Sequence, residues 1–381
     1  MLVLDVLLTA AVAFIITFLA IPIILQVAEK KNLYDIPDER KIHTNPVASL
    51  GGVGIFAGFL LASLLSIQVY LNQEFQYFFA AALVIFFLGL KDDLMILSAS
   101  KKFIGQIIAA SILIHLGGIR FDSMHGLFGF EEVSEGFGLA LSYLTIIVVI
   151  NSFNLIDGVD GLASSLGILS MFVFGIYFFI INQQAYALLS FAMAGSLVAF
   201  LIFNHQPARI FMGDSGSLMI GLVNSILVIK FINVANAPLV AVPIQSAVAV
   251  GFAILIVPLL DTLRVFSIRI YKGRSPFTPD RNHVHHLLLD RGLSHAAVTF
   301  TCVGINILFI AMAYLGKSLG PNYLLLIMLS ISFAGLGMLY YARPRRKMVI
   351  AKRSDGATEL KTASKVVTLT KEKETPAAGQ N

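Results

Sequence analysis

Four groups of polar residues interrupt a strongly apolar chain, and each has residue types that could handle phosphate or a metal ion. The first is the adjacent pair Asp92 and Asp93. Two neighbouring carboxylates repel each other, and a divalent cation or a bound proton would relieve that repulsion. A hydrated loop after a helix would also explain the pair. Lys101 and Lys102 follow closely, where each could contact a phosphate or mark a membrane boundary.

The second group places a polar residue at every third position, namely Asn151, Asn154, Asp157 and Asp160. On an ideal helix these side chains would spread over about half of the circumference. Gly158 and Gly161 instead favour a turn that leads into a helix. The amide and carboxylate groups could contact a sugar, a base or a metal-bound phosphate, or they could simply form turns and cap helices. Their position beside an apolar segment favours a functional role.

The third group is a glycine-rich turn that contains Gly213, Asp214, Ser215 and Gly216. The glycines allow the backbone to approach a ligand closely, and Asp214 offers a hard oxygen ligand for Mg²⁺. An apolar segment follows, and the free N–H groups at its start could hold an anion. Alternatively, Asp214 or Ser215 only caps that helix.

The fourth group holds three histidines within four positions, His283, His285 and His286. Thr278, Pro279 and Gly292 outline a short helix around them. On that helix His283 and His286 would share a face and His285 would point elsewhere. Zinc binding is an alternative, but no cysteine or fourth ligand is near. Phosphate contact or proton transfer fits these histidines better.

Long apolar stretches must position these four groups. Mean hydropathy is +0.85 and 13% of the residues are charged, roughly half the charge of a soluble chain. Each membrane span needs roughly 20 apolar residues. We therefore expect an all-α, polytopic integral membrane protein with about eleven transmembrane helices, at 4–27, 50–71, 77–90, 103–118, 138–150, 162–181, 186–203, 217–235, 243–263, 297–316 and 321–342.

The distribution of basic residues predicts the orientation of these spans. With the N-terminus outside, 24 Lys and Arg residues fall in the cytoplasmic loops and tail, and three fall on the other side. Cytoplasmic loops of membrane proteins carry such an excess. We therefore expect the C-terminus and all four polar groups on the cytoplasmic face. The net charge of +5 then reflects topology and does not indicate nucleic-acid binding.

The composition changes abruptly where the last apolar stretch ends. We expect a transmembrane domain at 1–342 and a basic tail at 343–381. The tail is rich in Lys, Thr and Glu, so we expect it to be disordered and held near the membrane by its basic start.

A membrane transporter is the weaker of two functional classes. Transporters place ionisable residues near the bilayer midplane, whereas the centres of these spans are almost free of charge. A polar site at the inner interface suits an enzyme that joins a water-soluble substrate to a lipid headgroup.

In their order along the chain, the polar motifs resemble those of the polyprenyl-phosphate N-acetylhexosamine-1-phosphate transferases, glycosyltransferase family 4. The resemblance runs from Arg40 to Gly292. It comprises Arg40-Lys41-x-His43 with a later Gly51-Gly52, then Asp92-Asp93, Asn151 to Gly161, Phe211 to Ser217, and His283-x-His285-His286. Each motif is a modest signal, but the ordered set on the inner loops is highly specific.

This resemblance implies the transfer of a sugar-1-phosphate from a UDP-sugar to a polyprenyl phosphate, with Mg²⁺ as cofactor and Mn²⁺ as its alternative. Asp214 would be a Mg²⁺ ligand, and Asp92 and Asp93 would serve the lipid phosphate, one of them as a candidate general base. The catalytic residues would be Asp92, Asp93, Asp214, His283 and His286. The substrates would be bound by Arg40, Lys41, His43, Lys102, Asn151, Asn154, Asp157, Asp160, Gly213, Ser215, Arg281 and His285.

Two departures from the pattern select a branch of the family. The phospho-MurNAc-pentapeptide translocases carry a Thr-Pro-Thr-Met-Gly-Gly stretch and three consecutive histidines. This chain has Asn45-Pro-Val-Ala-Ser-Leu-Gly-Gly52 and His-Val-His-His. Both differences favour the undecaprenyl-phosphate GlcNAc-1-phosphate transferases, which begin the synthesis of cell-envelope polysaccharides. The pentapeptide branch and other N-acetylated sugars stay as alternatives.

The same resemblance defines the expected surroundings of the protein. The partners would be a UDP-N-acetylhexosamine, undecaprenyl phosphate and membrane lipids, with a homodimer as an open alternative. The location would be the bacterial cytoplasmic (inner) membrane, with the active site on the cytoplasmic face.

Overall fold

The computed structural model describes residues 2–33, 47–237, 240–273 and 283–341, together with three short strands near the C-terminus. The chain divides into two compact units, Met1–Leu336 and Gly337–Asn381.

Helices dominate the first unit, and eight of those in the described residues are long and apolar enough to cross a membrane. A helix satisfies its own backbone polar groups, which is required where no water is present. These eight are α1 (Leu2–Lys31), α4 (Ala99–Ser111) with its π-helical continuation η1 (Ile112–Leu116), α5 (Glu135–Ile156), α6 (Leu162–Ile180), α7 (Gln184–Asn204), α8 (Gly213–Ala235), α12 (His295–Leu315) and α13 (Pro321–Tyr341).

Three predicted spans depart from this pattern. The span at 50–71 is the shorter helix α2 (Gly51–Ser66), and the span at 77–90 lies within α3 (Glu74–Leu94). The span at 243–263 is broken into α9 (Ala247–Ile254) and α10 (Ile256–Tyr271), which meet at 83°. All eleven predicted stretches therefore coincide with helices, but eight helices qualify as spans in the described part of the chain, or nine with the bent pair.

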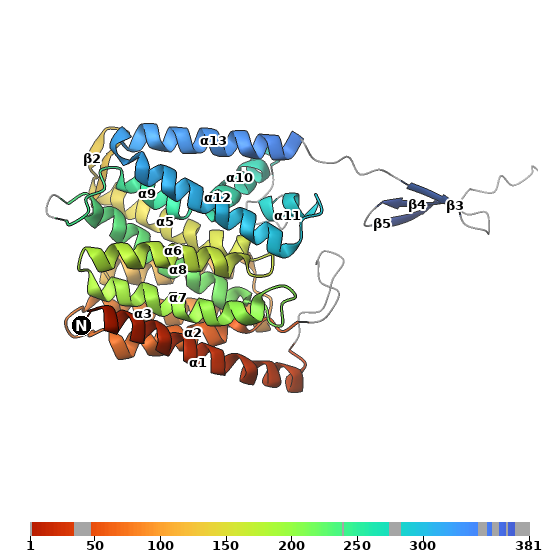
Figure 1. Ribbon diagram of the computed structural model, residues 1–381, viewed down its shortest axis with the longest axis horizontal. Helices are drawn as coiled ribbons and strands as arrows, with labels where there is room; N and C mark the ends of the chain where they lie inside the picture. Colours follow the sequence, from red (N-terminus) through yellow and green to blue (C-terminus); the bar gives the residue numbers. More distant parts are fainter. Residues whose placement is uncertain are drawn as a thin grey trace, which may run out of the picture. The chain divides into compact units, whose positions relative to one another are not determined.

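Helix α8 lies among its neighbours and is buried along nearly its whole length (Figure 1). It contacts α2, α3, α5 and α6. Small residues allow this close approach, as is common between membrane helices. A Cβ added to Gly89 of α3 would lie 2.5 Å from the Cα of Ser215, and one on Gly52 of α2 would collide with the backbone of Gly216. Helices α2 and α3 therefore converge on the start of α8.

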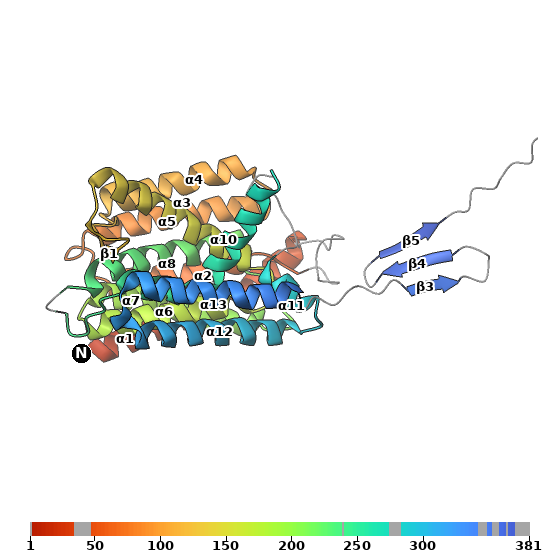
Figure 2. The ribbon, with the colours of Figure 1, turned by 90° about the horizontal axis from the view of Figure 1, so that it is seen from above.

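The break between α9 and α10 turns α10 across the direction of the long helices (Figure 2). The backbone groups freed by the break need partners, and Asn306 of α12 supplies them. Its Nδ2 donates to the carbonyl of Ile254 at 3.0 Å, and its Oδ1 accepts from the backbone N–H of Val257 at 3.2 Å. The bend is thus fixed by a side chain from a later helix.

Shorter elements complete the first unit. Strands β1 (Ser123–Leu127) and β2 (Phe130–Glu132) form an antiparallel hairpin, α11 (Val284–Leu289) precedes α12, and the 3-10 turn η2 (Lys317–Leu319) precedes α13.

The second unit contains an antiparallel sheet with the order β3 (Val349–Lys352), β4 (Thr358–Thr362) and β5 (Lys365–Leu369). We predict a disordered tail from its composition, and the structure describes these three segments of it as strands. They contain Val, Ile and Thr, which favour extended backbone. The division between the two compact units falls after Leu336, within α13.

Candidate active site

The polar groups of the sequence meet at one end of the helices. Helices α3, α5, α7 and α10 finish at this end, and α4, α6, α8 and α12 begin there (Figure 1). Because consecutive helices run in opposite directions, groups far apart in the sequence become neighbours.

Asp93 joins the end of α3 to the start of α8. Its carboxylate accepts hydrogen bonds from the backbone N–H groups of Asp214 at 2.6 Å and Ser215 at 3.0 Å, and from the Ser215 hydroxyl at 2.6 Å. The first N–H groups of a helix have no partner within that helix, so Asp93 caps α8 from another helix. Gly213 has φ +72°, and a Cβ there would lie 2.7 Å from both Asp93 oxygens.

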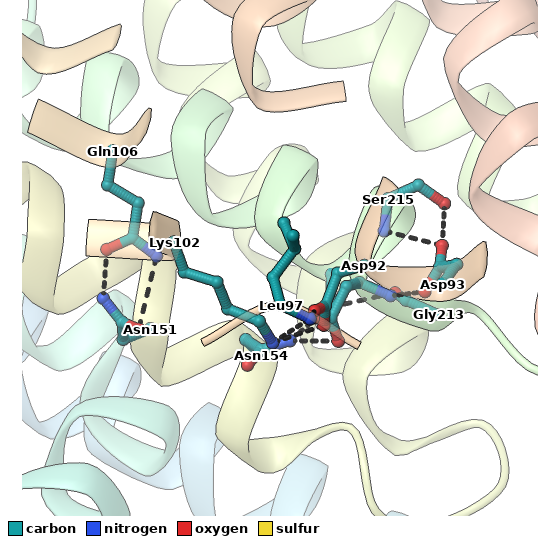
Figure 3. A network of polar contacts seen from close by, with 11 residues as sticks. Asp92, Asp93, Leu97, Lys102, Gln106, Asn151, Asn154, Gly213 and Ser215 are labelled. Carbon is teal, nitrogen blue, oxygen red and sulfur yellow. Dashed lines mark hydrogen bonds and ion pairs between the residues drawn. The ribbon is translucent and has the colours of Figure 1, made fainter. Parts of the chain in front are cut away.

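Asp92, the adjacent carboxylate, points to a different set of partners (Figure 3). One oxygen accepts from the backbone N–H of Leu97 at 2.6 Å, and the other lies 2.5 Å from the ammonium of Lys102. The same ammonium lies 2.6 Å from an oxygen of Asp214. We call Asp92 and Asp214, with Lys102 between them, the lysine-bridged carboxylates.

Asn154 orients the second oxygen of Asp214. Its Nδ2 donates to Asp214 Oδ1 at 2.8 Å and to the Ser217 hydroxyl at 3.0 Å. Asn151, one turn earlier, exchanges hydrogen bonds with Gln106 of α4 at 2.8 and 3.3 Å. Helix α5 extends six residues beyond its predicted end at Ile150. Both asparagines are therefore helical, and the predicted turn begins only at Asp157.

Asp157 lies in that turn, between α5 and α6, where negative charge accumulates. Burial, and then the nearby carboxylates of Asp214, Asp93 and Asp160, raise the pKa of Asp157 to about 8. A carboxyl group that resists ionisation for these reasons indicates a site with too little positive charge. A bound cation would correct this imbalance.

Asp160 holds the turn against two other segments. It lies 3.4 Å from His295 of α12 and accepts from the backbone N–H of Ala208 at 3.3 Å, and its carbonyl accepts from the Thr299 hydroxyl at 3.1 Å. Its side chain is buried and is not among those that line the cavity described below. These contacts are structural, and its predicted role in substrate binding stays a prediction.

The histidines are arranged differently from the prediction. The predicted helix start at Thr278 and Pro279 lies outside the described residues. Helix α11 begins at Val284, and His283 precedes it with extended backbone (φ −65°, ψ 152°). Helical spacing therefore does not apply to His283. Its ring stacks on that of His285, with centroids 5.4 Å apart. The ring of His286 is tilted relative to it, with the centroids 6.4 Å apart. The prediction that His285 points away from the other two is wrong.

His285 packs against the turn that follows α5. A Cβ added to Gly158 would lie 2.6 Å from His285 Nε2, so this glycine makes room for the ring. Burial lowers the pKa of His285 to about 3, and the ring is therefore neutral at pH 7. Its position suggests that it holds the two segments together.

A cavity of about 460 Å³ connects three of the four polar groups. This is within the size range of small-molecule sites. Hydrophobic residues form part of its wall, and its polar lining consists of Lys102, Gln106, Asn151, Asn154, Arg269 and His283. The predicted residues Lys102, Asn151, Asn154 and His283 are thus brought together.

Three residues at the site were not among our predicted site residues. Gln106 and Arg269 line the cavity, and Asp261 contacts His283. In the sequence, Gln106 is a single polar residue in an apolar stretch, and Arg269 resembles a boundary charge. Asp261 gives the clearest signal, because a carboxylate within a span is costly without a partner.

Four predicted residues lie outside the described part of the chain. Arg40, Lys41 and His43 fall within 34–46, and Arg281 falls within 274–282.

The donor set suits a hard cation such as Mg²⁺. Mg²⁺ is usually held by one or two carboxylates together with substrate phosphates and water. The lysine-bridged carboxylates direct two oxygens at one positive group, the Lys102 ammonium. Within the described ranges no three His, Cys, Asp or Glu side chains form a metal site. Water and substrate phosphate oxygens would complete the coordination of Mg²⁺.

Known proteins are similar to this chain in sequence over most of its length. A model described as glycosyl transferase family 4 matches residues 75–232, from α3 to α8. An undecaprenyl-phosphate alpha-N-acetylglucosaminyl 1-phosphate transferase of Yersinia pestis is 30% identical, covering 81% of this chain and 84% of that protein. A probable undecaprenyl-phosphate N-acetylglucosaminyl 1-phosphate transferase of Bacillus subtilis is 31% identical, covering 81% and 85%.

A decaprenyl-phosphate N-acetylglucosaminephosphotransferase of Mycobacterium leprae is 32% identical, covering 75% of this chain and 77% of that protein. The similarity extends over most of each chain, so the predicted resemblance is confirmed. The protein belongs to glycosyl transferase family 4.

Proposed function

We propose that the protein transfers GlcNAc-1-phosphate from UDP-GlcNAc to undecaprenyl phosphate, as the first step of a cell-envelope polysaccharide. The products are undecaprenyl-diphosphate-GlcNAc and UMP. The observation that carries this proposal is the cavity lined by Lys102, Asn154 and His283, in a chain related to GlcNAc-1-phosphate transferases. The carboxylate of Asp214 contacts both Lys102 and Asn154 of that lining. A phosphate oxygen of the lipid forms a bond to the sugar-linked phosphorus, and the bond from that phosphorus to UMP breaks.

The residues of the site would contribute mainly charge and position. Phosphoryl transfer depends on charge neutralisation and alignment more than on covalent help. Asp214 and Asp92 would hold Mg²⁺, which neutralises the diphosphate when bound. Lys102 adds a positive charge beside the same phosphates, and Asn154 fixes the orientation of Asp214. Asp93 fixes the start of α8, so the position of Asp214 depends on it.

We further propose eleven spans, an outer N-terminus and a cytoplasmic site in the bacterial inner membrane. The distribution of 24 and three basic residues supports this orientation. In a Cys302→Ser background, Lys101→Cys should react with an impermeant maleimide only in opened cells. Gln73 lies at the start of α3, at the end away from Asp92 and Asp93. Gln73→Cys should therefore react in intact cells. The reverse pattern would overturn the orientation.

Purified protein in vesicles with labelled UDP-GlcNAc tests the reaction. Labelled lipid and UMP should appear only when both undecaprenyl phosphate and Mg²⁺ are present. Label from UDP-MurNAc-pentapeptide instead would move the chain to the pentapeptide branch. Label from neither donor, with solute uptake into the vesicles, would favour a transporter.

A further inference from the structure

A buried carboxylate on α10 holds the first histidine of the His-Val-His-His segment. Asp261 Oδ2 lies 2.8 Å from His283 Nδ1, and Asp261 Oδ1 accepts from the backbone N–H of Val284 at 2.7 Å. Asp261 is 1% exposed and His283 is 5% exposed. Water therefore competes little for either hydrogen bond, and both the ring and the start of α11 are tied to α10.

The chemistry of the pair fixes which ring nitrogen carries the hydrogen. An ionised carboxylate only accepts hydrogen bonds, so His283 Nδ1 must be the donor. In the neutral ring, Nε2 then keeps its lone pair. His283 also lines the cavity that contains Lys102 and Asn154. The side of the ring that does not face Asp261 is thus available to a ligand in the cavity.

We infer that Asp261 is a positioning residue, which acts on the transfer reaction through His283. It sets the ring orientation and tautomer so that His283 Nε2 can take a proton or, once protonated, donate to an oxygen of the bound diphosphate. This inference rests on the proposed function. It gives a role to the buried carboxylate of α10, which does not contact the lysine-bridged carboxylates.

A purely structural role for Asp261 would look different. Capping the backbone N–H of Val284 needs one acceptor oxygen, which Asn also provides. Accepting the hydrogen bond from His283 Nδ1–H needs a second acceptor oxygen. Asn would place its NH₂ group there, which either loses this hydrogen bond or forces His283 into the tautomer with its hydrogen on Nε2. Asp261→Asn therefore separates the two roles, because it keeps the cap and disturbs the ring.

The test is a double-mutant cycle of Asp261→Asn and His283→Ala, with kcat and KM for UDP-GlcNAc measured per folded protein. Asp261→Asn should lower kcat by about 10–100-fold, the range for residues that orient a functional histidine. In the His283→Ala background it should cost less than about twofold, because the residue through which it acts is gone. Thr262→Val is the matched control, since its buried hydroxyl has no partner among the described residues. It should retain full activity.

Equal losses from Asp261→Asn in both backgrounds, or no loss in the wild-type background, would overturn the inference. If Asp261→Asn does not fold, Asp261→Glu enters the same cycle, since it keeps a carboxylate but shifts the ring. Failure of the proposed function is a separate result, because the unmodified protein would then not transfer GlcNAc-1-phosphate at all.

Discussion

The lysine-bridged carboxylates and the Asp261–His283 pair provide partners for acidic side chains in opposite ways. Asp92 and Asp214 face the ammonium of Lys102, whose side chain is 27% exposed and also lines the cavity. Asp261 is enclosed, and its partners come from the adjacent residues His283 and Val284. An ammonium on a long side chain can be exchanged for another cation, whereas an enclosed ring cannot leave easily. The first arrangement suits a site that takes up and releases charge, and the second suits a fixed functional group.

The largest effect should come from replacing the acidic residue at the centre of the first region. Asp214→Asn removes a negative charge where the metal would bind, and we expect a loss of transfer of about 1,000-fold with a weaker response to Mg²⁺. The measurement is the rate of UMP release across a Mg²⁺ titration. Asp122→Asn, at an exposed position, is the control and should behave as wild type. Near-normal activity of Asp214→Asn would remove its role as a ligand.

The support beneath this region can be tested at Gly213. Gly213→Ala adds strain at φ +72° and a Cβ against the Asp93 carboxylate, so the start of α8 must shift. A shift of about 1 Å can cost about 100-fold in rate, and we expect a loss of that order. Gly292→Ala is the matched control, since it has φ +86° but open space around it. It should show strain of about 1–3 kcal/mol and little loss of activity.

Thermal unfolding of both glycine variants should be followed by circular dichroism, because the chain has no Trp. Equal losses of activity in the two variants would show that strain alone, and not the contact with Asp93, controls the site.

If a metal ion replaces the Lys102 ammonium at the lysine-bridged carboxylates, removing that ammonium should strengthen metal binding. Lys102→Met removes the ammonium, so Mn²⁺ should bind the substrate-free protein about fivefold more tightly, from about 1 kcal/mol for a partly exposed ion pair. Transfer should nevertheless fall. Electron paramagnetic resonance of Mn²⁺ measures the affinity, with Lys101→Met as the control. His283→Ala should leave the Mn²⁺ affinity unchanged. An unchanged Mn²⁺ affinity in Lys102→Met would show that the ammonium of Lys102 does not compete with a metal ion.

The smallest effect concerns stability. Asp157 has a raised pKa of about 8, so the folded protein binds more protons than the unfolded chain between about pH 4 and pH 8. The metal-free protein should therefore lose stability as pH rises through this range. Asp157→Asn removes this part of the loss, and thermal unfolding at pH 5 and pH 8 measures it. An identical pH dependence of thermal stability in the variant and the wild type would contradict the inferred excess of negative charge around Asp157.

The sequence predicts the helical stretches and most of the site because both depend on local patterns. Hydropathy identifies the eleven apolar stretches, and the order of the polar motifs identifies residues such as Lys102, Asn154 and Asp214. These motifs meet at one end of the helices, and three of them line one cavity, because consecutive helices alternate in direction.

What the sequence does not predict depends on contacts between distant segments. Asp92 and Asp93 are chemically identical neighbours, yet one faces Lys102 and the other caps α8, since successive side chains on a helix point about 100° apart. The pairing of Asp261 with His283 requires the bend between α9 and α10, and hydropathy shows only a continuous apolar stretch. The turn after α5 begins later than the predicted end of this span at Ile150, because Asn151 and Asn154 find partners on α4 and α8.

The bend at Leu255 also has a consequence for how the chain assembles in the membrane. Helix α9 has eight residues, which is too short to cross a bilayer by itself. The carbonyls at its end are satisfied by Asn306, which is synthesised about fifty residues later. Until α12 is inserted, this break would leave polar backbone groups exposed to lipid. We therefore expect α10 to reach its mature path late in biogenesis, after α12 supplies Asn306, and a chain truncated before α12 would lack the side chain that fixes the bend.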